Sequence, residues 1–345
     1  MVKVAIIGGT GYTGVELLRL LAQHPRAEVV AISSRSEAGR PVADLFPNLR
    51  EHYDLRFTDP ADVDYADIDL VFFATPHGVA QSSMAKVLSS GTKVVDLSAD
   101  FRIQDQQVWE HWYNQDHQCP ELISEAVYGL PEVNRDKIRD ARLVAAPGCY
   151  PTSAQLGLIP LLEQSGLVNL ETIVVNSASG VTGAGRQASL ATLFSEVSDS
   201  FSAYKVSGHR HLPEIEQGLA SIAGAPVTIT FVPHLLPVNR GIHTTLYLDL
   251  LDSAERDYQA IFEDRYRDEP FVDVLPEGQL PTLKSVRGTN MCRLSVQRPL
   301  GRNKLVVAVV EDNLTKGASG QAIQCMNIML GFDEAAGLES VALMP

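Results

Sequence analysis

Apolar and polar positions follow a regular order in the first half of the chain, where short apolar runs are followed by amphipathic stretches. The runs are rich in β-branched residues, which is typical of strands buried in a parallel sheet. The stretches Val15–Leu21 and Ala80–Leu88 have helical spacing. This alternation predicts an α/β fold with a doubly wound parallel sheet. Its strands are expected at Val2–Ile7, Glu28–Ser34, the first parts of Asp69–Gly78 and Lys93–Arg102, and Leu143–Ala146.

The region between the last two of these strands has a different pattern. Gln104–Ser124 is polar and aromatic and predicts a helical excursion, whereas Tyr128–Glu132 has the composition of a turn-rich linker.

The second half of the chain predicts an α+β domain with a mainly antiparallel sheet. Val227–Val232 and His243–Leu250 alternate apolar with polar residues, as half-exposed antiparallel strands do. Near the C-terminus a loop of small residues opens a helix, and we expect the chain to return there to the first domain. The expected domains are 1–147 with 314–345, and 148–313. Further strands are expected at Thr172–Ser179, Arg293–Gln297 and Lys304–Val310, and a helix at Ala254–Tyr266.

Composition narrows the class of protein. The chain has 345 residues, of which 45% are hydrophobic and 20% charged, as expected for a globular enzyme of two domains. Its net charge of −14 argues against nucleic acid or an anionic membrane as the main partner. Four widely spaced cysteines suggest neither a disulfide framework nor a metal site. With no signal peptide or membrane span apparent, a cytoplasmic location is expected.

A glycine loop follows the first predicted strand. Gly8, Gly11 and Gly14 lie between this strand and a helix, in a variant of the Rossmann dinucleotide fingerprint. Backbone N–H groups at such a helix start bind a pyrophosphate. We therefore expect a nicotinamide dinucleotide here, bound also by the intervening residues Thr10, Tyr12 and Thr13.

The end of the second strand favours NADP over NAD. An NAD enzyme usually has an acidic residue there to bind the ribose hydroxyls. This chain has Ser34 and Arg35 instead, which suit a 2′-phosphate. The alternative is an ordinary solvated loop.

Residues at the ends of the next strands are expected at the edge of the same site, because ligands bind beyond the carboxyl ends of parallel strands. They are Ala74, Thr75, Pro76 and Ser98 for the cofactor, and Arg102 for a substrate anion. An arginine can hold a carboxylate or phosphate bidentately. Arg102 can equally form a surface ion pair with a neighbouring aspartate.

Cys149 follows the last strand of the series in the segment Pro147-Gly148-Cys149-Tyr150-Pro151-Thr152. A turn delivers it to the start of an apolar helix, where the helix dipole favours the thiolate. It is the candidate nucleophile. The alternative is a small buried hydrophobic residue.

Candidate partners for this cysteine lie in the second half. His209 and His211 are candidate acid–base groups, with His211 slightly preferred because it directly precedes a helix start at Pro213. No further ligand near them completes a metal site, so no metal is expected. Other candidates are Ser179, Gly180, Arg186 and Arg210 for an anionic substrate, and Asn313 and Lys316 for the nicotinamide end of the cofactor.

Taken together, the chain resembles the N-acetyl-γ-glutamyl-phosphate reductase family of arginine biosynthesis, which is similar to the aspartate-semialdehyde dehydrogenase superfamily. The resemblance spans the chain. Its most specific parts are Pro147–Thr152 and the run His209–Gln217, and it also includes Gly8–Gly14, Asp96–Arg102, Ser179–Arg186, Pro233–Ile242 and Asn313–Gln321.

The resemblance implies a cytoplasmic NADP-dependent enzyme with a small acyl-phosphate substrate. It implies that Cys149 forms a thioester, that NADPH reduces it to N-acetylglutamate 5-semialdehyde, and that His211 or His209 handles protons. A homo-oligomer, dimer or tetramer, is also implied. Three alternatives are open: an aspartate-semialdehyde dehydrogenase, the carrier-protein-linked reductase of lysine biosynthesis, and a catalytically silent NADP-sensing protein.

Overall fold

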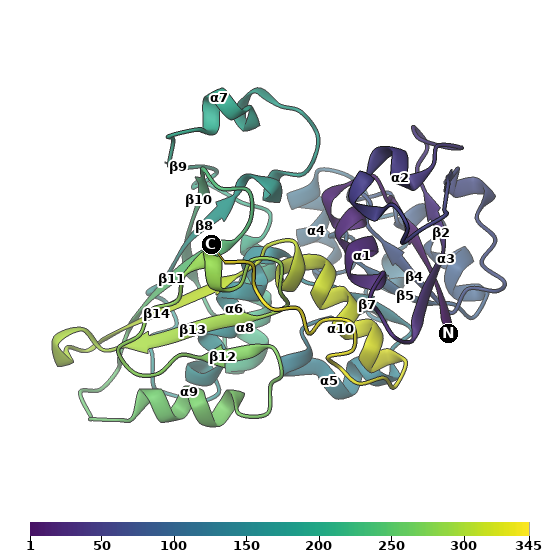
Figure 1. The fold of residues 1–345 in the computed structure, drawn as a ribbon. Coiled ribbons are helices and arrows are strands. Elements are labelled where there is room, and N and C mark those ends of the chain that lie inside the picture. Colours follow the sequence, from purple (N-terminus) through teal and green to yellow (C-terminus); the bar gives the residue numbers. More distant parts are fainter. Residues whose placement is uncertain (345) are drawn as a thin grey trace. The chain divides into compact units, whose positions relative to one another are not determined.

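The computed structural model describes residues 1–344, which divide into two compact units (Figure 1). The first unit comprises Met1–Pro147 and Ala318–Ser340. The second comprises Gly148–Gly317 and the described residues from Val341 onward. Within residues 1–344, no helix combines the length and the apolar character needed to cross a bilayer.

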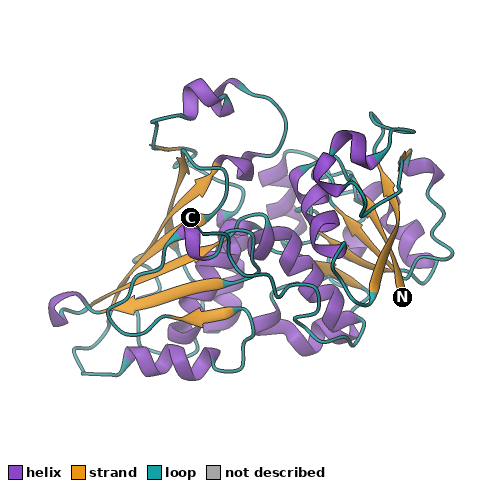
Figure 2. Ribbon diagram, viewed as in Figure 1, coloured by secondary structure: helices purple, strands orange, loops and turns teal. Residues whose placement is uncertain are grey.

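A seven-stranded sheet forms the centre of the first unit (Figure 2). All of its neighbouring strands are parallel, in the order β3-β2-β1-β4-β5-β7-β6. This is the doubly wound sheet expected from the alternation of apolar runs and helices. Its strands are β1 (Val2–Ile7), β2 (Ala27–Ser33), β3 (Phe57–Thr58), β4 (Leu70–Phe73), β5 (Lys93–Asp96), β6 (Val127–Tyr128) and β7 (Leu143–Ala145).

Helices bury both faces of this sheet. Val71, Phe73 and Val94 share one core cluster with Met84 and Val87 of α3. Helices α1 and α10 pack together on the other side, and α10 also contacts α5 and β5. The helices of the first unit are α1 (Tyr12–Leu21), α2 (Val42–Leu45), α3 (Gln81–Ser89), α4 (Gln106–Tyr113), α5 (Pro131–Asp140) and α10 (Gly320–Met329).

The strand order reverses between β1 and β4, which places a topological switch point there. From β1 the chain builds outward to β2 and β3 and then returns to β4 on the other side. In open α/β sheets, ligands bind beyond the carboxyl ends of the strands at such a point. The loops after β1 and β4, both expected to bind the cofactor, therefore lie together.

A buried histidine fixes the C-terminal segment of the first unit. His24 is 6% exposed, and its Nε2 lies 2.9 Å from Oδ1 of Asn327 in α10. Its Nδ1 accepts hydrogen bonds from the backbone N–H groups of Arg26 and Ala27. These contacts assign the neutral form with the proton on Nε2, and burial lowers the pKa of His24 below its ordinary 6.5.

We expect the stability contributed by His24 to be lost as the pH falls below about 6.5. Below that value the unfolded chain binds a proton at His24 that the folded chain excludes, so acid favours unfolding. Protonation at Nδ1 would also break two backbone hydrogen bonds. Thermal unfolding followed by circular dichroism between pH 5 and pH 8 measures this. His24→Gln should have a lower melting temperature at pH 7.5 and a smaller loss on acidification; an equal loss would contradict the assignment.

A second seven-stranded sheet forms the centre of the second unit, in the order β12-β13-β14-β11-β8-β10-β9. It is mixed: β10 is parallel to β8 and β12 is parallel to β13, whereas the other neighbours are antiparallel. Its strands are β8 (Ile173–Gly180), β9 (Ser202–Ala203), β10 (Ile229–Leu236), β11 (Ile242–Asp249), β12 (Val272–Val274), β13 (Cys292–Gln297) and β14 (Lys304–Glu311).

One face of the second sheet is covered by helices. Helix α6 packs against β11 and β14, and at Gly157 it comes so close to Leu246 and Val309 that no side chain fits. Tyr266 of α9 donates a hydrogen bond to the Leu156 carbonyl of α6. The helices of the second unit are α6 (Cys149–Leu162), α7 (Phe194–Val197), α8 (Leu212–Ala223) and α9 (Tyr258–Tyr266).

The expected α/β fold class is confirmed, but several local predictions were wrong. Tyr128–Glu132 is not a linker, because β6 ends and α5 begins within it; Pro131 occupies the first helical position, where proline is favoured. Strand β10 is parallel to its neighbour β8, although its alternation predicted an antiparallel strand; alternation reports a half-exposed face and not strand direction. Helix α9 begins only at Tyr258, because the Asp257 side chain caps it.

Candidate active site

Cys149 is the first residue of α6. Gly148 is the N-cap in an extended conformation, and the first turn contains no acidic residue. No carboxylate in the first turn therefore offsets the positive end of the helix dipole at the thiol, and this favours the thiolate. Helix α6 begins earlier than the apolar pattern suggested, because Pro151 lies in the first turn, where its missing N–H costs nothing.

A buried glutamate fixes the backbone just before Cys149. Oε1 of Glu214 accepts a hydrogen bond of 2.8 Å from the Gly148 N–H, and Glu214 is 1% exposed. It lies in the first turn of α8, three residues after His211, which is the N-cap of that helix. One helix start thus holds both a candidate acid–base residue and the residue that anchors the loop carrying the candidate nucleophile.

An aromatic cluster joins both candidate histidines to the residue that follows Cys149. The Tyr150 ring centroid lies 5.6 Å from that of His209 and 5.8 Å from that of His211, and the two histidine rings are 4.9 Å apart. Tyr204 and Phe231 complete the cluster, with ring centroids 5.7 and 5.5 Å from that of His209. The structure therefore brings the three residues predicted to be catalytic into one neighbourhood of the second unit.

His209 is held in its neutral form. Burial, with the nearby charges of Lys205 and Arg210, lowers the pKa of His209 to about 4. The His211 backbone N–H donates to its Nδ1 over 3.1 Å, which assigns the ring proton to Nε2. In this tautomer His209 offers a hydrogen-bond donor at Nε2, not a base.

Two tyrosine hydroxyls meet beside the nucleophile. The Tyr150 and Tyr204 oxygens are 3.0 Å apart. Burial, followed by smaller effects that include negative charge at Cys149, raises the pKa of Tyr204 to about 12. It raises that of Tyr150 still further. Both hydroxyls therefore remain protonated at neutral pH, and one of them donates to the other.

The other wall beside Cys149 is backbone. A Cβ placed on Gly317 would lie 2.8 Å from the Cβ of Cys149 and 2.9 Å from Oε1 of Glu311, so this position admits no side chain. Glu311 ends β14 and is completely buried. Gly317 lies in a π-helical turn, Thr315–Ser319, and Gly317 N–H donates to the Asp312 carbonyl.

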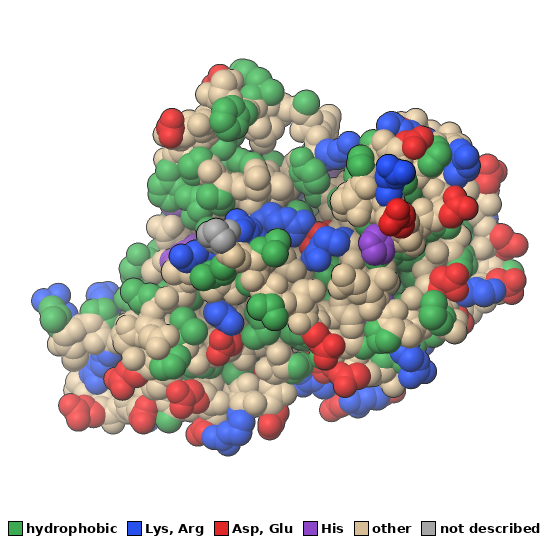
Figure 3. Space-filling model, viewed as in Figure 1, with side chains coloured by type: hydrophobic (Ala, Val, Ile, Leu, Met, Phe, Trp, Pro, Cys, Tyr) green, Lys and Arg blue, Asp and Glu red, His purple; other side chains and the backbone are tan. Residues whose placement is uncertain are grey.

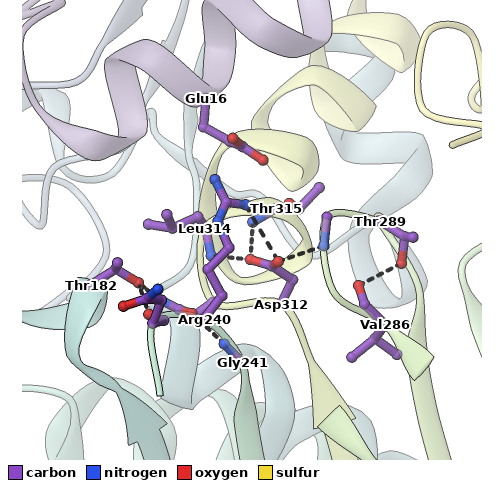
Figure 4. A network of polar contacts seen from close by, with 12 residues as sticks. Glu16, Thr182, Arg240, Gly241, Val286, Thr289, Asp312, Leu314 and Thr315 are labelled. Carbon is purple, nitrogen blue, oxygen red and sulfur yellow. Dashed lines mark hydrogen bonds and ion pairs between the residues drawn. The ribbon is translucent and has the colours of Figure 1, made fainter. Parts of the chain in front are cut away.

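A polar network supports the loop after β8, which follows the predicted substrate residues Ser179 and Gly180 and contains Arg186. Asn313 accepts from the Gly241 N–H through Oδ1 at 2.7 Å and donates to Thr182 Oγ1 through Nδ2 at 3.0 Å. Asp312, beside it, accepts from the Gly288 N–H and pairs with Arg240 at 3.4 Å (Figure 4). Asn313, predicted to meet the nicotinamide, is 2% exposed and here ties together the loops after β8 and β10.

The remaining candidates of the second unit differ in burial. Ser179 is buried and its hydroxyl donates to the Gly180 carbonyl at 3.0 Å, whereas a Cβ on Gly180 would meet the backbone of Asn239 and Arg240. Lys316 is completely buried, with Nζ 5.9 Å from the Phe271 ring centroid. Arg186 and Arg210 are exposed.

The glycine loop of the first unit has the form of a phosphate cradle. Gly8 has φ +88°, and a Cβ there would lie 2.7 Å from the Ala74 carbonyl oxygen. A Cβ on Gly14 would lie 2.7 Å from the Gly9 backbone, so these two glycines allow close packing. Gly11 instead faces open space and caps α1, whose first turn has no acidic residue. An anion can therefore approach the N–H groups of Thr10, Tyr12 and Thr13, and this fits the pyrophosphate of a dinucleotide.

Two buried carboxylates organise the loops after β4 and β5. Asp96 accepts from both the backbone N–H and the hydroxyl of Ser98, and Asp100 accepts from the Gly78 N–H at 2.6 Å. Burial, together with the charge of Asp100, raises the pKa of Asp96. Arg102 is buried, 7% exposed, and its Nη2 donates to the Leu97 carbonyl at 2.7 Å, so it is not a surface residue.

The other predicted cofactor residues lie around the glycine loop. Thr75 Cγ2 is 2.9 Å from the position of a Cβ on Gly8, and Pro76 follows in the same loop. Ser34 is buried at the end of β2 and contacts Ser36 through its hydroxyl. Arg35 is exposed next to it.

Comparisons with known proteins agree with these two units. A family model described as "Semialdehyde dehydrogenase, NAD binding domain" matches residues 3–141, and one described as "Semialdehyde dehydrogenase, dimerisation domain" matches residues 149–313. N-acetyl-gamma-glutamyl-phosphate reductases of Saccharophagus degradans and Cellvibrio japonicus are 60% and 62% identical to the chain, and the matches cover 100% of each protein. The chain belongs to this family. The resemblance identified from the motifs is thereby confirmed.

Solved structures share the fold at much lower identity. Aspartate semialdehyde dehydrogenase II of Vibrio cholerae, complexed with ASA, matches with a TM-score of 0.74 and 17% identity over 96% of this chain and 98% of that one. The Candida albicans aspartate semialdehyde dehydrogenase with NADP matches with a TM-score of 0.71 and 16% identity, over 96% and 99%. Reductases of the chain's own family and these dehydrogenases therefore share one architecture.

Sequence reasoning missed three residues of the site. Glu214 belongs to the same motif as the histidines, and its position three residues after a helix N-cap is a signal that could have revealed it. Gly317 gave no signal beyond its place in a loop of small residues. Tyr204 gave none, because its contact with Tyr150 depends on the pairing of β9 with β10.

Proposed function

We propose that this chain catalyses the NADPH-dependent reduction of N-acetyl-γ-glutamyl phosphate to N-acetylglutamate 5-semialdehyde with release of inorganic phosphate, as a step of arginine biosynthesis. The observation that carries the proposal is the cluster of Cys149, His209 and His211 around Tyr150, with Cys149 at the start of α6. Full-length identity of about 60% to reductases of this name supports the substrate.

Cys149 is the nucleophile in this mechanism. Its Sγ attacks the acyl carbon, the bond from that carbon to the phosphate oxygen breaks, and inorganic phosphate leaves a thioester on the enzyme. His211 accepts the thiol proton, because the Nδ1 of His209 is already engaged by a backbone donor. Neutral His209, and the tyrosine of the Tyr150–Tyr204 pair that does not donate to the other, can donate hydrogen bonds to the oxygen that develops negative charge.

A bound NADPH would supply the hydride for reduction of the thioester carbon. The fit of Gly8, Gly11 and Gly14 to a pyrophosphate supports its binding at the loop after β1. His211 then returns its proton to the oxygen of the hemithioacetal on Cys149. Transfer of this hydroxyl proton to the sulfur, with cleavage of the carbon–sulfur bond, releases the aldehyde and restores the thiol.

Arginines are the candidates for the two anionic groups of the substrate. Arg102, buried at the end of the loop after β5, is suited to a fixed carboxylate or phosphate. Arg186 and Arg210 are exposed and are the further candidates to bind an anion.

For the cofactor, we expect Arg35→Ala to weaken NADPH binding about 10- to 100-fold and NADH binding much less. A guanidinium–phosphate hydrogen bond is of the charged kind, which contributes about 1.5–3 kcal/mol. Titration of cofactor fluorescence with both dinucleotides measures the two dissociation constants. Arg50→Ala, which also removes an exposed arginine from the first unit, is the control. Equal losses for both cofactors in Arg35→Ala would show that this residue does not bind the 2′-phosphate.

The proposed reaction is tested in reverse, as phosphate-dependent NADP⁺ reduction. N-acetylglutamate semialdehyde should be oxidised only when phosphate is present, and aspartate semialdehyde should be a poor substrate. Activity with aspartate semialdehyde alone would replace the proposal by the aspartate-semialdehyde dehydrogenase alternative. Activity that requires a carrier protein on the substrate would favour the lysine-pathway alternative.

We propose further that the chain forms a homo-oligomer through the face of the second sheet that α6 does not cover. In a protein of net charge −14, the only Asp, Glu, Lys or Arg that the central four strands place on this face are Asp249 and Lys304, which pair with each other at the ends of β11 and β14. Interface cores are depleted in such residues. The dimerisation model that matches 149–313 supports this assembly. The residues of this outer face are Thr230, Val232, His234, Val174, Asn176, Ala178, His243, Thr245, Tyr247, Val306, Ala308 and Val310.

A cytoplasmic location belongs to the same proposal. All four cysteines are free thiols, as expected in a reducing compartment.

A further inference from the structure

A segment of the second unit exposes an unusual number of large apolar side chains. We call residues 186–206 the arm; it contains α7 and β9 and projects from the end of β10 (Figure 1). Phe194 is 86% exposed and Leu190 72% exposed, and Leu193, Phe201 and Val206 are exposed as well. Hydrophobic side chains at the surface of this projecting part can be seen in Figure 3.

The arm cannot cover these side chains itself. Its one helix, α7, is a single turn, and Val197 is the residue of that turn that is buried. Isolated exposed apolar residues are common on protein surfaces, but a group of them marks a contact site. Within residues 1–344 this group lies at the surface, so its cover must come from another molecule or from a movement of the arm.

The charges of the arm argue against a lid over a bound substrate. The arm has basic residues at its two ends, Arg186 and Lys205, whereas the charged residues between them are Glu196 and Asp199. An acyl phosphate with a carboxylate is strongly anionic, and the exposed middle of the arm offers it only acidic and apolar side chains. The composition suits an apolar protein surface.

The arm is continuous with the outer face of the second sheet. The Phe201 ring stacks on His234 with centroids 4.9 Å apart and an interplanar angle of 19°. His234 belongs to that outer face and pairs with Ala203 of β9. From this continuity we infer that the arm packs against a second copy of this chain, extending the contact made by the outer face. The inference rests on the proposed homo-oligomer.

Such a contact affects the active site through Tyr204, at the end of the arm that adjoins β10. The Tyr204 N–H donates to the Pro233 carbonyl at 3.0 Å, and its hydroxyl meets that of Tyr150 beside Cys149. The Tyr204 ring also packs against His209. A second copy that holds the arm therefore holds Tyr204 and His209 in place around the nucleophile, and the separated chain loses this support.

The test compares two double variants by sedimentation velocity over a concentration series. Leu190→Ser with Phe194→Ser should weaken self-association at least about 100-fold. Each copy loses two apolar side chains that become buried in the proposed contact. Leu280→Ser with Leu300→Ser removes two other exposed leucines from the second unit and should leave association unchanged. Circular dichroism confirms that both variants are folded.

Activity measured over the same concentrations completes the test. The arm variant should lose turnover when diluted below its new dissociation constant and regain it at higher concentration, with the parent unaffected. An arm variant that associates like the parent overturns the inference. If that variant is also inactive at all concentrations, the arm supports the active site of its own chain without a second copy. A parent that is monomeric throughout overturns the homo-oligomer and the arm contact together, while its activity still tests the proposed reaction separately.

Discussion

Cys149→Ser should lower reductive turnover by about 10⁴-fold or more and leave NADPH affinity unchanged. A serine hydroxyl at this position is not ionised at neutral pH and the helix start cannot make it so, whereas a thiol there becomes a thiolate. Losses of this size are typical when a nucleophile is removed, because the remaining groups no longer act together. The glycine loop lies in the first unit and is not altered by the substitution.

The thioester is detected directly by a phosphate burst. Mixing the parent enzyme with N-acetyl-γ-glutamyl phosphate in the absence of cofactor should release about one equivalent of phosphate per active site before any steady rate. Cys149→Ser should show no burst. Cys119→Ala is the matched control, since burial raises the pKa of that thiol to about 12 and it should take no part. A normal burst in Cys149→Ser would remove the nucleophile assignment.

Glu214→Ala is expected to lower kcat about 100-fold with little change in NADPH affinity. The substitution leaves the Gly148 N–H buried without its acceptor, which costs about 1–3 kcal/mol, and it frees the loop that carries Cys149. Small displacements of a nucleophile have large effects on rate. Glu214 is a positioning residue, so the loss should appear in kcat and in the burst rate.

Glu214→Gln separates the hydrogen bond from the charge. Its amide oxygen can still accept from Gly148, so most of the activity should return. A glutamine variant as impaired as the alanine variant would mean that the carboxylate charge matters more than the hydrogen bond. Full activity of Glu214→Ala would contradict the positioning role.

The parts of the fold that were predictable are those with a local cause. The β1–loop–α1 unit is a continuous segment whose apolar run, glycines and helical spacing each limit the conformation. The position of Cys149 at a helix start was also predictable, because a turn, a cysteine and an apolar helix adjoin in the sequence. The strand order and the parallel pairing of β10 with β8 were not predictable from pattern, since these pairings join residues far apart in the chain.

The surroundings of the nucleophile were harder to predict for the same reason. Glu214 and Gly148 are 66 positions apart, and only the packing of α6 against α8 makes them partners. The sequence also did not decide whether Arg102 is buried, because an arginine next to aspartates in the sequence is equally consistent with a surface ion pair. Its burial follows from the Asp96 and Ser98 contacts that shape the loop.

The main-chain character of the walls beside Cys149 has a consequence for redesign of the enzyme. Gly148 and Gly317 offer no side chain that can be exchanged to suit a longer or differently branched acyl group, and Gly317 tolerates no added atom. Side-chain variation for a new acyl group must therefore come from elsewhere, and the exposed residues 183–186 are the natural place to introduce it. Libraries that keep both glycines fixed should retain acylation chemistry while acyl preference changes.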